Sequence, residues 1–485
     1  MSERRAFFGT VALAGAQVAR LGLQFAVLPV LARILGPSAY GLVALAMPFI
    51  LLANMVADAG LGNALVRVQN PSRALESTVF WLSVAVCVGL TLAIWALAWP
   101  ASRLLSAPRL PPILMALSAL LVVSGSLSVA NARIMRERRF AVFAASDATA
   151  SAVSAFCAIG AALLGCGAWS LVVQQLVLWL IKAVWVSAAA GFRPDFVCRP
   201  SLAKPYLSFG LNAAASNVAD FVSKNAPTVI VGGLLGVLAV GHYSMAFQLT
   251  RLPDSFISGP IYLAIFTAGA RVGDDHGRAV VLASRGLRGV ATAMAPIFGG
   301  LAMVADLAIK LLLGAKWAPA APILALLAPA GFLLCFYSII SAVLMGLGRA
   351  EWQLRLTVLS GATMGLGTLI GVRHGPAGVA VGLSIGAILV GPAYLWVLAR
   401  QLDMSVRRLA GEFAAPLLAT LAMMLAVAVA RLRLGHWSDW GQLLGAVAIG
   451  VASFALALAL LSGRRLLEDI RGLLPSRILA QPELS

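Results

Sequence analysis

The sequence predicts an all-α membrane protein that crosses the bilayer fourteen times, and three observations lead to that fold class. The chain is very apolar, its apolar runs recur at the length of a membrane span, and its Lys and Arg residues are distributed unevenly among the connecting segments. Of its 485 residues, 61% are hydrophobic and 11% are charged, whereas an average soluble protein carries about 25% charged residues. Assigning the apolar runs to the membrane leaves little chain for a separate soluble domain.

Fourteen apolar runs come close to the roughly 20 residues that a helix needs to cross the hydrocarbon core. They cover residues 8–34, 40–65, 79–99, 111–132, 143–165, 169–190, 206–235, 240–267, 286–311, 319–345, 354–372, 376–398, 409–431 and 440–463. The first run follows Arg4 and Arg5 closely and is longer than the apolar part of a signal peptide. We therefore expect it to be retained as the first transmembrane helix.

Lys and Arg residues gather on one side of the membrane if the N-terminus is cytoplasmic. The segments then assigned to the cytoplasm hold roughly three times as many of these residues as the external segments, which is the bias of the positive-inside rule. The pattern requires an even number of spans, so both termini are expected in the cytoplasm. The net charge of +18 is explained by this topology and by contact with anionic lipid. No basic cluster is long enough to indicate a nucleic-acid partner.

The cysteine and histidine residues do not indicate a metal or a cofactor. The five cysteines are scattered without a C-x-x-C pair, and the four histidines fall at or near predicted loops. No spacing matches a set of metal ligands, and no nucleophile–base pair indicates an enzyme. We therefore expect no metal site, no cofactor and no catalytic residues.

A short turn occurs twice, 200 positions apart. Residues 31–46 read LARILGPSAYGLVALA, and residues 231–246 read VGGLLGVLAVGHYSMA. Identical residues stand at 35 and 235, 36 and 236, 39 and 239, 41 and 241, and 46 and 246. Gly36, Pro37 and Gly41 fit a tight external hairpin that ends one helix and starts the next.

The repeat predicts two lobes. Because six spans separate the two copies, both run in the same direction across the membrane, which is typical of lobes related by an axis along the membrane normal. We expect a six-helix N-terminal lobe at residues 1–200 and a pseudo-symmetric six-helix lobe at 201–400. Two further helices and an amphipathic cytoplasmic tail are expected at 401–485.

Polar and charged side chains recur on single helix faces inside the predicted spans. The first span has Gln17, Arg20 and Gln24 at spacings of three and four, which places them on one face. The offset of 200 leads to a similar face in the seventh span. The second and eighth spans also carry such residues. The further candidates from these three spans are Asp58, Asn217, Asp220, Lys224, Gln248, Arg251 and Asp254. A charge at the bilayer centre costs about 2.5 to 3.5 kcal/mol on insertion scales, so such residues face a protein interior or a water-filled cavity.

Two interpretations of these residues stay open. The first is a cationic central cavity, lined by Gln17, Arg20, Gln24, Asn217, Lys224, Gln248 and Arg251, with Asp58, Asp220 and Asp254 as charge partners or ligands of a coupling ion. Arginine would suit phosphate groups because it can bind them through two parallel hydrogen bonds. The second interpretation is a structural network of salt bridges that ties the lobes together. Lys182 and Asp306 are two further charges within the predicted spans.

Two stretches resemble a known family. RILGPSAYGLVALA, followed by ADAGLGNALV, is similar to the N-terminal signature of the polysaccharide transporter, or oligosaccharide flippase, family. That family belongs to a superfamily with multidrug exporters and peptidoglycan lipid flippases. The shared pattern R-x-L-G-P-x-x-Y-G occupies residues 33–41, and NARIMRERRFAVFAASDATAS at residues 131–151 resembles a basic loop and the start of the fifth helix in the same family. The plan of fourteen spans extends the resemblance over the whole chain.

The resemblance implies a lipid-linked oligosaccharide flippase of the bacterial inner membrane. Such a protein moves an undecaprenyl-pyrophosphate-linked glycan from the inner to the outer leaflet by alternating access. The resemblance also implies coupling to H⁺, Na⁺ or the membrane potential, and a polysaccharide polymerase with its chain-length machinery as partners. The single lysine of the seventh span stands beside an aspartate, so Lys224 fits an anion site less well than Arg20 and Arg251 do.

Two alternatives have different sequence requirements. A multidrug exporter of the same superfamily favours an acidic or aromatic cavity for organic cations, and the deep charges here include Arg20. A membrane-embedded polysaccharide ligase or polymerase needs a sizeable external loop with catalytic residues, and no predicted external loop here is longer than about a dozen residues.

Overall fold

The computed structural model describes residues 22, 26–57, 65, 68, 71–137, 139–199, 201, 225–272 and 275–473, with side chains described through 462 except at 140. Within these ranges all regular structure is helical, which confirms the all-α class. Nine helices of the described residues are long and apolar enough to cross a membrane, and a bent pair adds a tenth candidate. One of the nine, Ala350–Gln401, covers two predicted spans. The total of fourteen spans stays a prediction.

Two compact units divide the chain. The first contains Met1–Met245 and Leu313–Trp317, and the second contains Ala246–Leu312 and Ala318–Ser485. The described helices of the first unit are α2 (Pro37–Ala57), α4 (Arg73–Leu104), α5 (Leu110–Ser126), α6 (Ser128–Arg136), α7 (Phe140–Leu163), α8 (Trp169–Ala190), the short helix Asn225–Leu235 and the 3₁₀ turn η2 (Ala315–Trp317). Helix α10 (Val237–Pro253) begins in this unit and continues into the second.

Local sequence explains where the helices of the first unit begin and end. Ser72 precedes α4 and its hydroxyl accepts a hydrogen bond from the Leu75 N–H, a typical N-cap. Helix α8 ends at Gly191, whose left-handed φ of 58° favours glycine. Helix α5 packs against α2, α4 and α8, and α7 packs along α8. The predicted span 111–132 differs from a single straight helix, because α5 and α6 meet at a bend of 43°.

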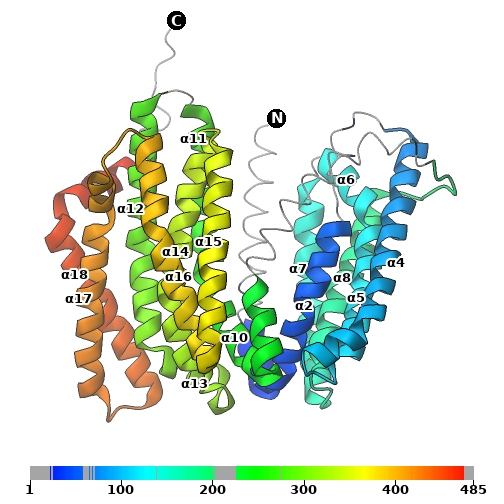
Figure 1. Ribbon diagram of the computed structural model, residues 1–485, viewed down its shortest axis with the longest axis horizontal. Coiled ribbons are helices and arrows are strands. Elements are labelled where there is room, and N and C mark those ends of the chain that lie inside the picture. The colour runs from blue at the N-terminus through cyan, green and yellow to red at the C-terminus, as the bar shows by residue number, and fades with distance from the viewer. Residues whose placement is uncertain are drawn as a thin grey trace, which may run out of the picture. The chain divides into compact units, whose positions relative to one another are not determined.

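The second unit is built around a helical core. Its remaining elements are the π-turn η1 (Asp254–Ser258), α11 (Gly259–Val272), α12 (His276–Met303), α13 (Ala305–Leu313), α14 (Ala320–Gly346), α15 (Ala350–Gly371), the 3₁₀ turn η3 (Val372–His374), α16 (Gly375–Gln401), α17 (Val406–Leu434) and α18 (Asp439–Leu473). Phe298, Tyr337 and Tyr394 from α12, α14 and α16 lie in its core. Figure 1 shows α17 and α18, in orange and red, beside each other, and α17 packs against α12.

The repeated turn has the predicted form in both copies. Helix runs to residue 34 and resumes at Pro37, and it runs to Leu235 and resumes at Val237. Gly236 has a φ of +83°, a conformation that side chains with a Cβ rarely adopt. Pro37 occupies the first helical position, where its missing N–H leaves no hydrogen bond unmade. The offset of 200 therefore marks the same structural position twice.

Candidate functional site

Three of the ten candidate site residues lie within the described part of the chain. They are Gln248, Arg251 and Asp254, on α10 and at the start of η1. The other candidates, Gln17, Arg20, Gln24, Asp58, Asn217, Asp220 and Lys224, lie outside the described residues. The geometry of the candidate site is therefore that of the α10–η1 segment.

Gln248 and Arg251 form an exposed polar face on α10. They are one turn apart and both are exposed, whereas their neighbours Leu249 and Thr250 are buried. The Arg251 guanidinium lies 5.9 Å from the ring centre of Phe247, an arrangement that orients the cation. Arg251 is 14 residues into α10, about 21 Å along the axis at 1.5 Å per residue. Among the described residues it forms no ion pair.

Asp254 lies where α10 gives way to a π-turn. Pro253 ends the regular hydrogen-bond pattern, and residues 254–258 adopt the wider π geometry, which is frequent at functional sites. One carboxylate oxygen of Asp254 accepts a hydrogen bond of 3.5 Å from the Cys335 thiol on α14. Asp254 forms no salt bridge with Arg251 or with any other described cation. Among the described residues, Asp254, the predicted charge partner, therefore contacts a thiol and no cation.

Several other charges within the predicted spans are paired. Lys182 of α8 contacts Asp147 of α7 at 2.7 Å, and Arg288 of α12 binds Glu412 of α17. Asp306 of α13 binds Arg431 of α17 at 2.5 Å. These charges are therefore held in local ion pairs, each of which lies within one unit. Arg251 differs from them because it has no described carboxylate partner.

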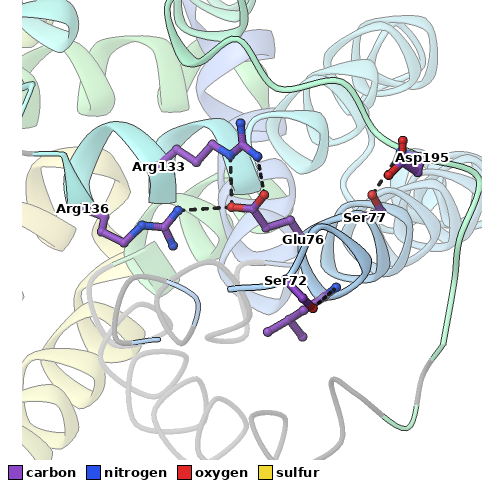
Figure 2. A network of polar contacts seen from close by, with 7 residues as sticks. Ser72, Glu76, Ser77, Arg133, Arg136 and Asp195 are labelled. Atoms are coloured by element: carbon purple, nitrogen blue, oxygen red, sulfur yellow. Dashed lines mark hydrogen bonds and ion pairs between the residues drawn. The ribbon is translucent and has the colours of Figure 1, made fainter. Parts of the chain in front are cut away.

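A buried ionic network joins α4 to α6. Figure 2 shows Arg133 and Arg136 converging on Glu76, whose side chain is 3% exposed. Arg133 donates from both Nε and Nη2 to the carboxylate, the Nε bond being 3.0 Å, and Arg136 donates at 3.2 Å. The predicted basic loop thus has a structural function: its arginines fix the end of α6 against the first turn of α4.

The segment after α8 lies across the start of α4. We call residues 192–199 the strap. The Asp195 N–H donates to the Ser77 hydroxyl at 3.0 Å (Figure 2), and the Trp81 indole donates to the Asp195 carbonyl at 2.9 Å. Phe196 stacks on Trp81 with ring centres 5.7 Å apart. The beginning of the predicted connection between the lobes is therefore attached to α4 of the first unit.

Comparisons with known proteins agree on one family. Residues 30–322, more than half of the chain, match the family model described as "Polysaccharide biosynthesis protein". The chain is 30% identical over 462 residues to the succinoglycan biosynthesis transport protein ExoT of Rhizobium meliloti (strain 1021), covering 93% of this chain and 91% of that protein. It is 25% identical over 381 residues to the lipopolysaccharide biosynthesis protein WzxC of Escherichia coli (strain K12), covering 77% and 76% of the two chains.

Solved structures with the same fold include transporters of two kinds. The lipid II flippase MurJ, in an inward closed conformation, superimposes with a TM-score of 0.75 at 14% identity and covers 95% of this chain and 100% of its own. An inward-facing multidrug resistance transporter of the MATE family gives 0.62 at 15% identity, covering 81% and 99%. These structures establish the shared fold, and the family match over residues 30–322 with the relationship to ExoT establishes that the chain belongs to the polysaccharide biosynthesis protein family of multi-pass membrane transporters.

Proposed function

We propose that the protein moves undecaprenyl-pyrophosphate-linked oligosaccharide units across the bacterial inner membrane by alternating access, for the synthesis of an O-antigen, a capsule or an exopolysaccharide. The family and the names of ExoT and WzxC support the substrate class, and the fold shared with a lipid II flippase supports the mechanism. The protein would act as a transporter and carry out no chemical step on its substrate.

Arg251 is the observation that carries this proposal at the level of the site. An exposed guanidinium without a described counter-ion, deep in an apolar chain, suits a diphosphate group that arrives with its own negative charge. Gln248 beside it offers an amide to the same ligand or to the adjoining sugars. Arg20, Gln17, Gln24, Asn217 and Lys224 complete the proposed cavity lining on sequence grounds, with Asp58, Asp220 and Asp254 as charge partners or ligands of a coupling H⁺ or Na⁺.

A multidrug exporter is the alternative that the fold permits, because a MATE transporter has the same architecture. The exposed charged side chain at the described site is a cation, Arg251, which opposes organic cations as substrates. One carboxylate oxygen of Asp254 accepts a hydrogen bond from the Cys335 thiol. We also propose that a polysaccharide polymerase and its chain-length machinery are partners of this protein. The proposed location is the inner membrane, with both termini in the cytoplasm.

Substitution of Arg251 tests the proposed site. Arg251→Ala removes a charge-assisted contact of about 1.5 to 3 kcal/mol, so glycan export should fall roughly ten- to hundredfold while protein levels stay unchanged. Arg251→Lys keeps the charge and should retain an intermediate rate. The measurement is surface glycan in cells that depend on this protein, with immunoblots for its abundance.

Arg355→Ala is the matched control for Arg251→Ala. Arg355 is also exposed and also lies against an aromatic ring of its own helix, 4.9 Å from Trp352, but it lies at the predicted cytoplasmic end of α15. Its removal should leave export within about twofold of the unsubstituted protein, the range of surface substitutions. Normal export by Arg251→Ala, or equal losses in both variants, would contradict the proposed cavity.

A further inference from the structure

The two copies of the repeated turn pack directly against each other within the first unit. A Cβ atom added at Gly41 would lie 2.0 Å from the Val237 carbonyl oxygen, and one added at Gly241 would lie 2.0 Å from the Pro37 carbonyl oxygen. These four residues are two pairs at the offset of 200, so the contact is reciprocal, as in a two-fold interface. Only glycine permits helices to approach backbone to backbone in this way.

Trp317 closes this contact from a third segment. It ends η2 and is completely buried. Its indole N–H donates to the Ala32 carbonyl oxygen at 2.8 Å. Its ring meets Tyr40 of the first copy edge-on at 5.4 Å and His242 of the second copy at 6.1 Å. We call residues 32–45, 231–245 and 313–317 the Trp317 junction.

His242 is a buried ionisable group in this junction that the proposed substrate site does not use. It is 8% exposed, and its Nε2 atom is buried without a hydrogen-bond partner. The ring is hydrogen-bonded to the backbone of Lys316. Because Nε2 has no partner, Nδ1 is the ring atom that makes this hydrogen bond. The neutral ring therefore fits the junction, and a second ring proton on Nε2 would find no acceptor there.

No carboxylate in the Trp317 junction offers a counter-charge to an imidazolium at His242, because residues 32–45, 231–245 and 313–317 contain no Asp or Glu. The first copy contributes Arg33, whose side chain lies 3.9 Å from the position of a Cβ on Gly314, and η2 contributes Lys316. Tyr40 offers only a phenol, and α10 has no described charge before Arg251. The carboxylates predicted on the same side of the membrane, Asp306 and Asp439, are paired with Arg431 and Lys310. A buried cation without a partner destabilises the arrangement that holds it.

We propose that the Trp317 junction is a proton-operated latch on the face that the charge distribution assigns to the outside, with His242 as its proton-binding site. A neutral His242 keeps the two turns closed around Trp317, and protonation from the outside separates them. This inference rests on the proposed alternating access, in which the outer end of the protein opens during each cycle. The latch would make opening depend on external protons, since the closed state binds the proton less well than the open state.

A cysteine in the junction can report its opening without transport. Ala39 is 8% exposed in the first turn of α2, and Ala39→Cys is introduced after Cys87, Cys157, Cys166, Cys198 and Cys335 are replaced by serine or alanine. The protein is purified into lipid nanodiscs and labelled with a maleimide between about pH 8 and pH 5.5, around the ordinary pKa of histidine. Rates are divided by those of a chain that keeps only Cys166, an exposed cysteine, because acid slows the thiol reaction itself.

The normalised rate at residue 39 should rise about tenfold on acidification, the change that corresponds to one pKa unit of difference between the closed and open states. His242→Gln keeps an amide donor for the Lys316 backbone but cannot titrate, so its rate should stay low and independent of pH. His242→Asn repeats this test with a shorter amide. Trp317→Phe loses the bond to Ala32, so its rate should be higher at every pH and still rise with acid.

A rate that does not change with pH, or a rise that His242→Gln retains in full, would overturn the latch. Neither result depends on a glycan, so the proposed transport function would still be tested separately by Arg251→Ala. Conversely, normal export by Arg251→Ala together with a pH response that requires His242 would contradict the substrate site and leave the latch in place.

Discussion

The charged residues of this protein fall into two groups, which differ in whether the structure shows a partner of opposite charge. Glu76 is almost fully buried and is bound by two arginines, whereas Arg251 is exposed and has no described carboxylate partner. A buried carboxylate is stable only when its hydrogen bonds are made, so the Glu76 network belongs to the scaffold. No comparable structural role explains an exposed cation inside a predicted span, so Arg251 is a candidate for contact with substrate.

Glu76→Gln should therefore destabilise the protein without a specific effect on substrate. The substitution leaves Arg133 and Arg136 partly buried beside a neutral amide, and breaking a buried ion pair in this way costs about 3 to 5 kcal/mol. The measurement is denaturant unfolding of the purified protein in detergent. Glu137→Gln is the matched control, because Glu137 is half exposed and pairs with the equally exposed Arg139. Its cost should stay below about 1 kcal/mol, and equal losses in both variants would contradict this assignment.

Some of the described helix pairs approach backbone to backbone at glycines, and α15 with α16 is an example. A Cβ atom on Gly367 would lie 2.1 Å from the Gly382 carbonyl oxygen, and one on Gly371 would lie 2.1 Å from that of Gly378. Small residues that bring backbones together are a main source of stability between membrane helices, where the hydrophobic effect contributes little. The same device joins the two repeated turns.

Two glycines of α15 predict opposite effects for the same substitution. Gly367→Ala should destabilise the protein by about 1 to 3 kcal/mol, because the methyl group meets a carbonyl oxygen of α16 that cannot move independently. Gly365→Ala has open space around its Cβ and should be neutral or stabilising by up to about 1 kcal/mol, since alanine favours helix. Thermal unfolding in detergent measures both. Equal shifts would show that α15 and α16 do not pack as described.

At the scale of an element, the sequence predicts the features that depend on neighbouring residues. Apolar length locates the helices, glycine with proline locates the turn at 35–37, and the offset of 200 locates its copy at 235–237. The apolar run 240–267 was interpreted as one continuous span, and the π-turn after Pro253, which packs against α14, was not predicted. The bend between α5 and α6 was not predicted, although residues 124–126 read SGS, the kind of Gly/Ser cluster at which helices kink.

At the scale of the whole molecule, the contacts that matter join residues far apart in the chain. The hydrogen bond from Trp317 to Ala32 spans 285 positions, and Arg133 reaches Glu76 over 57. No local pattern indicates either partner, so Trp317, His242 and Glu76 were not among the predicted functional or structural residues. The offset of 200 was visible in sequence, yet it did not reveal that the two turns meet.

The predicted topology can be tested with two native cysteines, because the structure shows both of them exposed. Cys166 lies between α7 and α8 on the predicted external side, and Cys198 lies in the strap on the predicted cytoplasmic side. Pro37 would be a poorer reporter, because it is buried at the start of α2.

In chains that keep one cysteine each, a membrane-impermeant maleimide should label Cys166 in intact cells and Cys198 only after permeabilisation. Cys87 is buried and should stay unlabelled in both conditions. Because six predicted spans precede Cys198 and five precede Cys166, the reverse pattern would invert the whole chain and place the Trp317 junction in the cytoplasm.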